Sequence, residues 1–171
     1  MKQIDEQEFQ QILNLEAQSK HYYGVNTILA WVCAALFSAA AVLTVQIEIC
    51  FVVFLFCAVM LVIVGVYFTF LYINARIRWK RLKSDKVQPV WGVCTGKEPF
   101  IVWKNGGGTV LVSSETQSSY RITADDKTYN MAQKGVPLWV VDFGKIFFIE
   151  IIKCYFPQAW KTAKTDDGTK G

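Results

Sequence analysis

The most constraining feature of this chain is an apolar run in its first half. Residues Ile49–Ile73 form 25 consecutive residues without a charged side chain. A run of about 18 or more such residues is long enough to cross the hydrocarbon core of a bilayer as a helix. The alternative is a core helix of a soluble protein, for which the apolar stretch is usually shorter. The sequence therefore predicts a transmembrane helix here.

A second apolar run, Val25–Val45, precedes the first and is also long enough to span a bilayer, although several polar residues interrupt it. It is not a signal peptide, because the run is too long and the residues before it are acidic rather than basic. Only Gln46–Glu48 separate the two runs. We therefore predict a membrane α-hairpin of two transmembrane helices over residues 25–73.

Positive charges indicate the direction of this hairpin. Lys and Arg close to the end of a span favour the cytoplasmic side, and the short turn contains neither. A basic juxtamembrane segment, residues 74–86, follows the second run. We therefore expect an integral membrane protein, in the bacterial inner membrane, with both termini cytoplasmic. The basic residues are Arg76, Arg78, Lys80, Arg81, Lys83 and Lys86.

These basic residues act either as an ordinary topological flank, which we favour, or as ligands for anionic lipid head groups. Aromatic residues beside the runs should anchor the hairpin at the cytoplasmic interface, where Tyr and Trp are enriched. The expected anchors are Tyr22, Tyr23, Tyr72 and Trp79.

Small residues recur at four-residue spacing in the first run. They form two rows, Ala30, Ala34 and Ser38 in one and Ala35 and Ala39 in the other. Small residues placed in this way let a second helix approach closely. We expect them to pack the hairpin on itself, the alternatives being dimerisation or docking on a larger membrane protein. Neither run contains a charged residue, which argues against a transporter or pump.

Residues 1–24 predict a short amphipathic helix, since Ile4, Phe9, Ile12 and Leu13 fall near a helical period. This helix lies either on the membrane surface or against protein. We favour protein, because its acidic residues would be repelled by anionic lipid.

Short apolar runs separated by turn residues fill residues 87–162, and the final residues 163–171 are expected to be disordered. This pattern predicts a small cytoplasmic all-β domain, an antiparallel barrel or sandwich. Asp125–Lys127 and Gly144 are interpreted as turns, and Asn105–Gly108 as a flexible hairpin loop. The segment 145–160 is a strand to about Lys153 or an interfacial helix, and we favour the strand. The expected strands are Val90–Cys94, Phe100–Lys104, Thr109–Ser113, Ser119–Thr123, Thr128–Met131, Val136–Asp142 and Lys145–Ile152.

The sequence offers no catalytic, cofactor-binding or metal-binding constellation. His21 is the only histidine, so the β-domain cannot form a Ser-His or Cys-His pair. The five cysteines show no CxxC spacing, which argues against a metal site. The tail also lacks the basic excess of a nucleic-acid-binding domain. We therefore predict a protein that is not an enzyme, needs no cofactor and binds no nucleic acid.

A membrane hairpin followed by a small β-domain is similar in outline to the NfeD-like membrane proteins. The matching residues are Lys134-Gly135-Val136, Leu138–Val141, Gly144 and a closing strand to Ile151. The resemblance implies an OB-type barrel for the last domain.

These observations predict a binding, scaffolding or regulatory subunit that presents its β-domain to a partner in a membrane complex. The expected partners are the lipid bilayer and either another protein or further copies of this chain. Two alternatives stay open. One is a small immunity protein against a membrane-acting toxin, and the other is an oligomeric channel.

Overall fold

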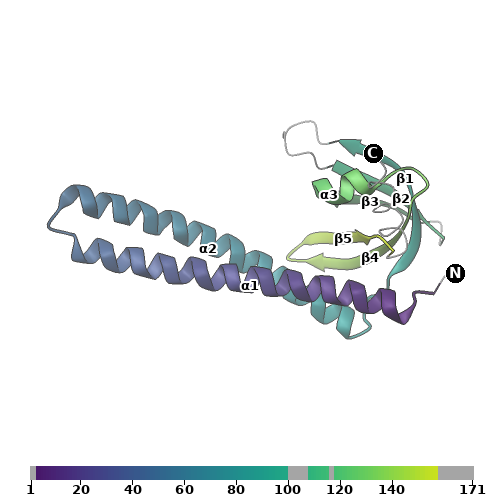
Figure 1. Cartoon of the computed structure of the whole chain (residues 1–171), viewed down its shortest axis with the longest axis horizontal. Coiled ribbons are helices and arrows are strands. Elements are labelled where there is room, and N and C mark those ends of the chain that lie inside the picture. The colour runs from purple at the N-terminus through teal and green to yellow at the C-terminus, as the bar shows by residue number, and fades with distance from the viewer. Residues whose placement is uncertain (1–2, 100–107, 116–117, 158–171) are drawn as a thin grey trace, which may run out of the picture. The chain divides into compact units, whose positions relative to one another are not determined.

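The computed structural model describes residues 3–99, 108–115 and 118–157 (Figure 1). The chain divides into two compact units, which we describe separately. Residues 14–80 form the hairpin unit. Residues 1–13 together with residues 81–171 form the sheet unit.

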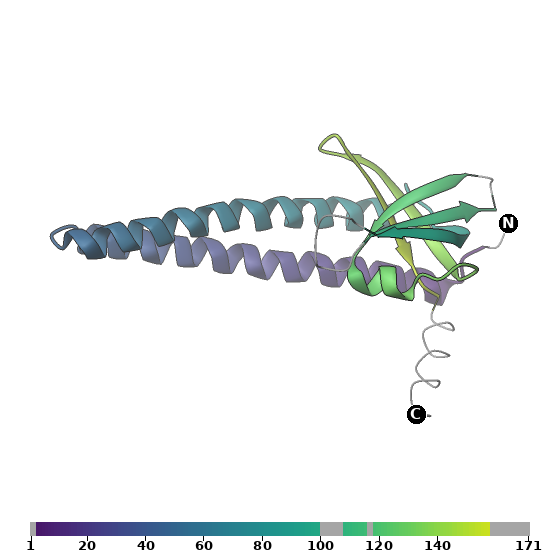
Figure 2. The same ribbon diagram turned by 90° about the horizontal axis from the view of Figure 1, so that it is seen from above.

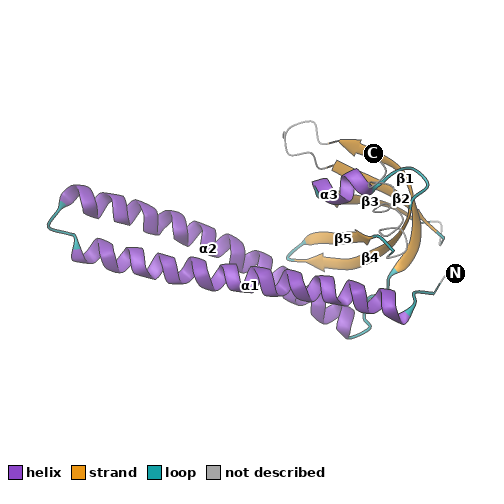
Figure 3. Ribbon diagram, in the orientation of Figure 1, coloured by secondary structure: helices purple, strands orange, loops and turns teal. Residues whose placement is uncertain are grey.

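Two long helices, α1 (Glu6–Leu43) and α2 (Glu48–Lys83), supply the hairpin unit, and Figure 3 shows the short loop that joins them. In the described part of the chain both are long and apolar enough to cross a membrane. Only 17% of the most apolar window of α1 and 11% of that of α2 is buried. A core helix of a soluble protein would be mostly buried. The predicted pair of apolar helices in a hairpin is confirmed.

The reversal lies at residues 44–47, slightly earlier than predicted, because Glu48 already belongs to α2. A carboxylate in the first turn of a helix is favoured by the helix dipole. The amide of Ile47 donates to the carbonyl of Thr44 at 2.9 Å and closes the turn.

The two helices pack on each other through aromatic side chains. The Trp31 ring lies against Gly65, and its indole nitrogen donates to the Thr69 hydroxyl at 3.1 Å. Phe37 and Phe54 have ring centroids 6.0 Å apart. The hairpin is therefore held by large side chains that meet small ones across the interface.

The described part of the sheet unit forms a five-stranded antiparallel sheet in the order β3-β2-β1-β4-β5. The edge strands β3 and β5 approach one another, but no ladder joins them, so the sheet is not closed into a barrel. The prediction of an antiparallel β-domain is confirmed, but the sheet does not close into a barrel. Its strands are β1 (Val90–Pro99), β2 (Gly108–Ser114), β3 (Ser119–Ala124), β4 (Pro137–Ile146) and β5 (Ile149–Tyr155).

The predicted strand Thr128–Met131 is wrong. These residues belong to a short helix, α3 (Asp126–Met131). Asp125, expected in a hairpin turn, is the N-cap of this helix and accepts a hydrogen bond from the Thr128 amide at 2.8 Å. A capping aspartate satisfies an amide that the first turn would leave unpaired, and this local bond outweighs the β-propensity of Thr and Tyr.

The turn predicted at Gly144 is also wrong. Gly144 lies within β4, at an irregularity in its pairing with β5, and has φ +65°. Its amide donates to the Asp142 side chain at 2.7 Å. The chain reverses three residues later, at Phe147 and Phe148, so the last strand is shifted toward the C-terminus. The preference for a strand over a helix in this segment is confirmed as far as Tyr155.

Figure 2 shows that the sheet is curled, and one cluster of buried side chains from several of its strands forms the core of the sheet unit. Strand β4 is buried on both faces, with Leu138 and Val140 in this core and Trp139 and Val141 on the other side. Gly108 begins β2 where no side chain fits, because a Cβ atom would lie 2.3 Å from the Tyr129 ring. The other core residues are Cys94, Val110, Val112, Ile122, Ala124, Ala132, Val136 and Phe156.

Some predictions fall on residues that the structure does not describe. These are the strand Phe100–Lys104, the loop residues 105–107 and the disordered tail 163–171.

The β4–β5 turn yields a prediction about stability. Phe147 and Phe148 have φ +48° and +67° in a two-residue loop, where Asn-Gly is preferred. Holding a bulky residue in this left-handed region costs about 1 kcal/mol or more. Replacing the pair by Asn-Gly should therefore stabilise the sheet by about 2 kcal/mol. Peptide-resolved hydrogen exchange of the full chain in detergent would measure this as stronger protection of β4 and β5.

The control for this experiment is the Phe147→Ala/Phe148→Ala variant, which removes both rings but keeps non-glycine residues at positive φ. This control should gain little hydrogen-exchange protection in β4 and β5. Equal protection in both variants would show that backbone strain is not the cause.

Candidate functional site

Several polar side chains in the apolar hairpin form hydrogen bonds with their own helical turn. The hydroxyls of Thr27, Ser38 and Thr69 donate to the carbonyls four residues earlier at 2.7–2.8 Å. Thr44 and Asn26 bond to the preceding turn in the same way. Hydrocarbon offers no hydrogen-bond partner, so such internal bonding is what lipid-facing polar side chains require.

The residues predicted to pack helices separate into two groups. Ala30 and Ala34 are buried, and so are Ala58 and Gly65 on α2. In contrast, Ser38, Ala35 and Ala39 are exposed. The row that begins at Ala30 therefore lies on the packed side of α1 as far as Ala34, while the second row faces away.

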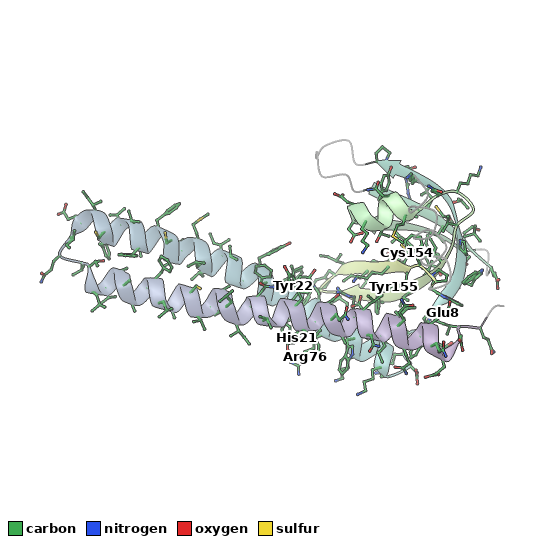
Figure 4. The ribbon with its side chains drawn as sticks, viewed as in Figure 1. Glu8, His21, Tyr22, Arg76, Cys154 and Tyr155 are labelled. Carbon is green, nitrogen blue, oxygen red and sulfur yellow. The ribbon has the colours of Figure 1, made fainter. Side chains whose placement is uncertain are left out.

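The predicted aromatic anchors all lie in the part of the hairpin unit nearest its chain ends. Tyr22 is exposed and makes an edge-to-face contact with Tyr23, with ring centroids 5.4 Å apart. Tyr72 packs beside Gly24. The Lys20 ammonium lies 3.7 Å from the centre of the Trp79 ring, a cation–π contact. Figure 4 labels Tyr22 and His21 on α1 and Arg76 on α2 in this region.

A buried ion pair joins the two helices beyond their apolar stretches. The Arg78 Nε atom donates to a Glu16 carboxylate oxygen at 2.9 Å, and the side chains are only 9% and 1% exposed. Asn74, one turn before Arg78, is also buried, and its Oδ1 atom has no hydrogen-bond partner among the described residues. The pair aligns α1 against α2 because neither charge can be left unpaired in this environment.

The six basic residues therefore have different surroundings. Arg78 is buried inside the hairpin unit, where it pairs with Glu16. In the sheet unit, the Arg81 guanidinium donates to the carbonyls of Phe143 and, at 3.2 Å, Lys145. The remaining four, Arg76, Lys80, Lys83 and Lys86, are exposed.

The first turns of α1 dock on the sheet within the sheet unit. The Trp139 indole nitrogen donates to the Glu8 carboxylate at 2.9 Å. Trp139 is buried and packs edge-to-face against Trp91, with ring centroids 4.7 Å apart. The amphipathic start of the chain is thus placed on protein through a buried tryptophan.

Beside this contact the sheet unit contains a cleft of about 540 Å³. Small-molecule and side-chain pockets commonly have volumes of this order. Three carboxylates line it, Glu6, Asp85 and Glu115, and none of the described Lys or Arg residues does. Asp85 has φ +52°, a conformation that Asp tolerates better than most residues. The other lining residues are Gln3, Ile4, Phe9, Gln88, Pro89, Val90 and Trp91.

This acidic and aromatic lining suits a cationic group. Carboxylates attract it, and a Trp ring can bind it through its face. The cleft is therefore the candidate functional site of the described chain. We refer to it as the acidic cleft.

The two cysteines of the sheet unit are not activated thiols. Burial raises the pKa of Cys94, and burial, followed by the nearby Asp125 carboxylate, raises the pKa of Cys154 to about 12. Both therefore stay protonated at neutral pH, whereas a nucleophile or metal ligand would need to be a thiolate. Within the described residues, no three His, Cys, Asp or Glu side chains are grouped to hold a metal ion.

Comparison with protein-family models, curated proteins and solved structures found no match. The function is therefore inferred from the residues of this chain.

Sequence reasoning missed the acidic cleft and the Glu16–Arg78 pair. The cleft is built from three segments distant in sequence, so no local pattern indicates it. The ion pair does leave a signal, because Glu16 and Arg78 are almost equally far from the turn at residues 44–47. Opposite charges at mirrored positions of an antiparallel hairpin are candidates for such a pair.

The buried pair yields a prediction about hairpin stability. Glu16→Gln leaves the Arg78 guanidinium buried without its counter-charge, which should cost about 3–5 kcal/mol. The double variant Glu16→Met/Arg78→Met should lose clearly less stability than Glu16→Gln, since both charges are removed together. Detergent-denaturation curves of the full chain would measure both.

The control is Lys80→Gln, which removes an exposed charge from the same helix and should change stability by no more than about 0.5 kcal/mol. If Glu16→Gln lowered the stability by no more than Lys80→Gln, the ion pair would not be what holds the hairpin together.

Proposed function

We propose that this chain is an integral membrane protein, not an enzyme, that presents its sheet unit to a partner protein at the cytoplasmic face of the membrane. The single observation that carries the binding role is the acidic cleft beside Trp91. We propose that its ligand is a basic segment of the partner.

Membrane insertion is supported by the surface of the hairpin unit. Large apolar side chains are exposed along both helices, among them Ile28 at 66%, Val42 at 72% and Ile49 at 80%. Soluble monomers rarely expose contiguous apolar patches of such extent. The internally bonded hydroxyls described above complete a surface that is compatible with lipid.

The proposed orientation follows from the exposed charges. Arg76 and Lys80 are exposed just beyond the apolar part of α2, whereas residues 44–47 contain no Lys or Arg. The positive-inside rule then favours a cytoplasmic sheet unit and an external turn.

We also propose that the sheet unit is an OB-type barrel left open at one seam. The order β3-β2-β1-β4-β5, with α3 between β3 and β4, supports this assignment. A fold of this type does not define a ligand, so the binding role rests on the acidic cleft. No observation on the described residues specifically favours the immunity-protein or channel alternatives.

The orientation can be tested by labelling. A cysteine placed at Gln46 should react with a membrane-impermeant maleimide in intact cells. A cysteine placed at Lys86 should react only after the membrane is opened. The unmodified chain gives the background from its own cysteines. Labelling of the Gln46 cysteine only in opened membranes would contradict the proposed orientation.

The acidic cleft can be tested with a cationic probe. Full-length protein in uncharged nanodiscs should bind an oligolysine peptide, and Glu6→Gln/Asp85→Asn/Glu115→Gln should weaken binding about tenfold. Each lost ion pair contributes about 0.5 kcal/mol, and the total corresponds to that factor. Fluorescence anisotropy of a labelled peptide would measure the affinity.

The matched control is Glu48→Gln/Asp126→Asn/Glu150→Gln, which removes the same number of charges at exposed positions outside the cleft. It should change the affinity much less. Equal losses in the two triple variants would show that net charge, and not the cleft, binds the peptide.

A further inference from the structure

The turn of the β4–β5 hairpin presents a cluster of large apolar side chains. Phe148 is 99% exposed, and Phe147 and Ile149 are 50% and 56% exposed. Figure 2 shows this hairpin extending away from the remaining strands of the sheet. We call residues 147–149 the hairpin tip.

The backbone of the tip is strained in order to carry these side chains. Both phenylalanines have positive φ in a loop whose geometry favours Asn-Gly. Strain of this kind is found at functional sites, where the side chain matters more than the local cost. Since the Phe148 ring contributes nothing to the core of the described sheet, its use must be sought outside it.

The charges around the tip indicate which surroundings it suits. Lys145 and Glu150 pair across the base of the hairpin and are exposed, while residues 146–149 carry no charge. The tip is thus an apolar end on a charged stem. Such an arrangement matches the boundary between lipid acyl chains and water, where apolar and aromatic groups enter and charges remain outside.

The stem of the tip contacts the part of α2 that belongs to the sheet unit. Arg81 donates to the carbonyls of Phe143 and Lys145, so the last turn of α2 is tied to the base of this hairpin. Arg81 follows Ile73, the last residue of the apolar run, by about 12 Å of helix. From Lys145 the strand reaches a further ~10 Å to Phe148. The ~10 Å of strand and the ~12 Å of helix are similar in length, so distance does not prevent Phe148 from reaching the membrane surface.

A protein partner fits the tip less well. A stable protein–protein interface buries about 800 Å² on each side, whereas the two aromatic side chains of the tip supply at most about 300–500 Å². The tip is too small for such an interface. It is sufficient for shallow insertion into lipid by a chain that is already anchored.

We propose that the hairpin tip inserts into the interfacial layer of the bilayer and fixes the orientation of the sheet unit at the membrane. This inference rests on the proposed membrane anchoring. The tip forms a second contact with the same bilayer, separate from the two helices and from the acidic cleft.

The test replaces Phe148 by p-benzoylphenylalanine, an apolar aromatic photo-crosslinker that extends the Phe ring by a benzoyl group. The full chain is reconstituted in vesicles of phosphatidylcholine and phosphatidylglycerol and irradiated, and lipid adducts are quantified by mass spectrometry. The control carries the same residue at Asn130, which is exposed on α3. Position 148 should yield about ten times more lipid adduct, because burial of a Phe ring favours contact by at least that factor.

Equal adduct yields at the two positions would overturn the inference, as would adducts at position 148 that join two protein copies. A second probe at Ile149 should behave like position 148 and guards against misfolding of one variant. Alkaline extraction of the same vesicles separates the two proposals. If the chain stays in the membrane while both tip positions yield no excess of lipid adducts, only this inference fails. If the chain is extracted, the anchoring fails and this inference with it.

Discussion

The apolar surface of α1 and α2 is the constraint on which the rest of the structure depends. Side chains such as Ile28 and Ile49 are more than half exposed, and exposure of this much apolar surface to water is unfavourable. The surroundings of these helices must therefore be apolar, or a partner must cover them. The helices meet the other requirement of hydrocarbon as well, since their hydroxyls are bonded within their own turns.

Beyond the apolar surface, the contacts of the chain depend on charged residues. The six basic residues among positions 76–86 suggest one common role in the sequence, yet their surroundings differ. Arg78 neutralises the buried Glu16, Arg81 binds carbonyls at an irregularity of β4, and Arg76 remains exposed. Arg suits the first two positions because its planar group donates several hydrogen bonds in fixed directions. The same local charge thus contributes to helix alignment, to the attachment of the sheet and to the predicted topology.

The elements that could be predicted from the sequence are those with a strong local period. The uncharged run Ile49–Ile73 lies within α2, and the alternating runs of the tail become β1 to β4. The errors occur where a single side chain determines the local secondary structure. Asp125 caps a helix that its neighbours would not otherwise favour, and Gly144 makes an irregularity inside a strand rather than a turn. In both cases the deciding hydrogen bond belongs to one side chain and leaves no periodic pattern.

The candidate site was less predictable because it depends on contacts between distant segments. Glu6, Asp85 and Glu115 look like ordinary solvated carboxylates in the sequence. They gather in one cleft because the first turns of α1 dock on β4, with Glu8 bonded to Trp139. The hairpin tip is the opposite case. Phe147 and Phe148 are visible in the sequence, but they read as part of an apolar strand. Only the backbone conformation places them at a turn, where the preference for Asn-Gly makes two phenylalanines costly. Both rings are at least half exposed, so packing within the sheet does not compensate for this cost, and contact with an apolar surface outside the sheet would.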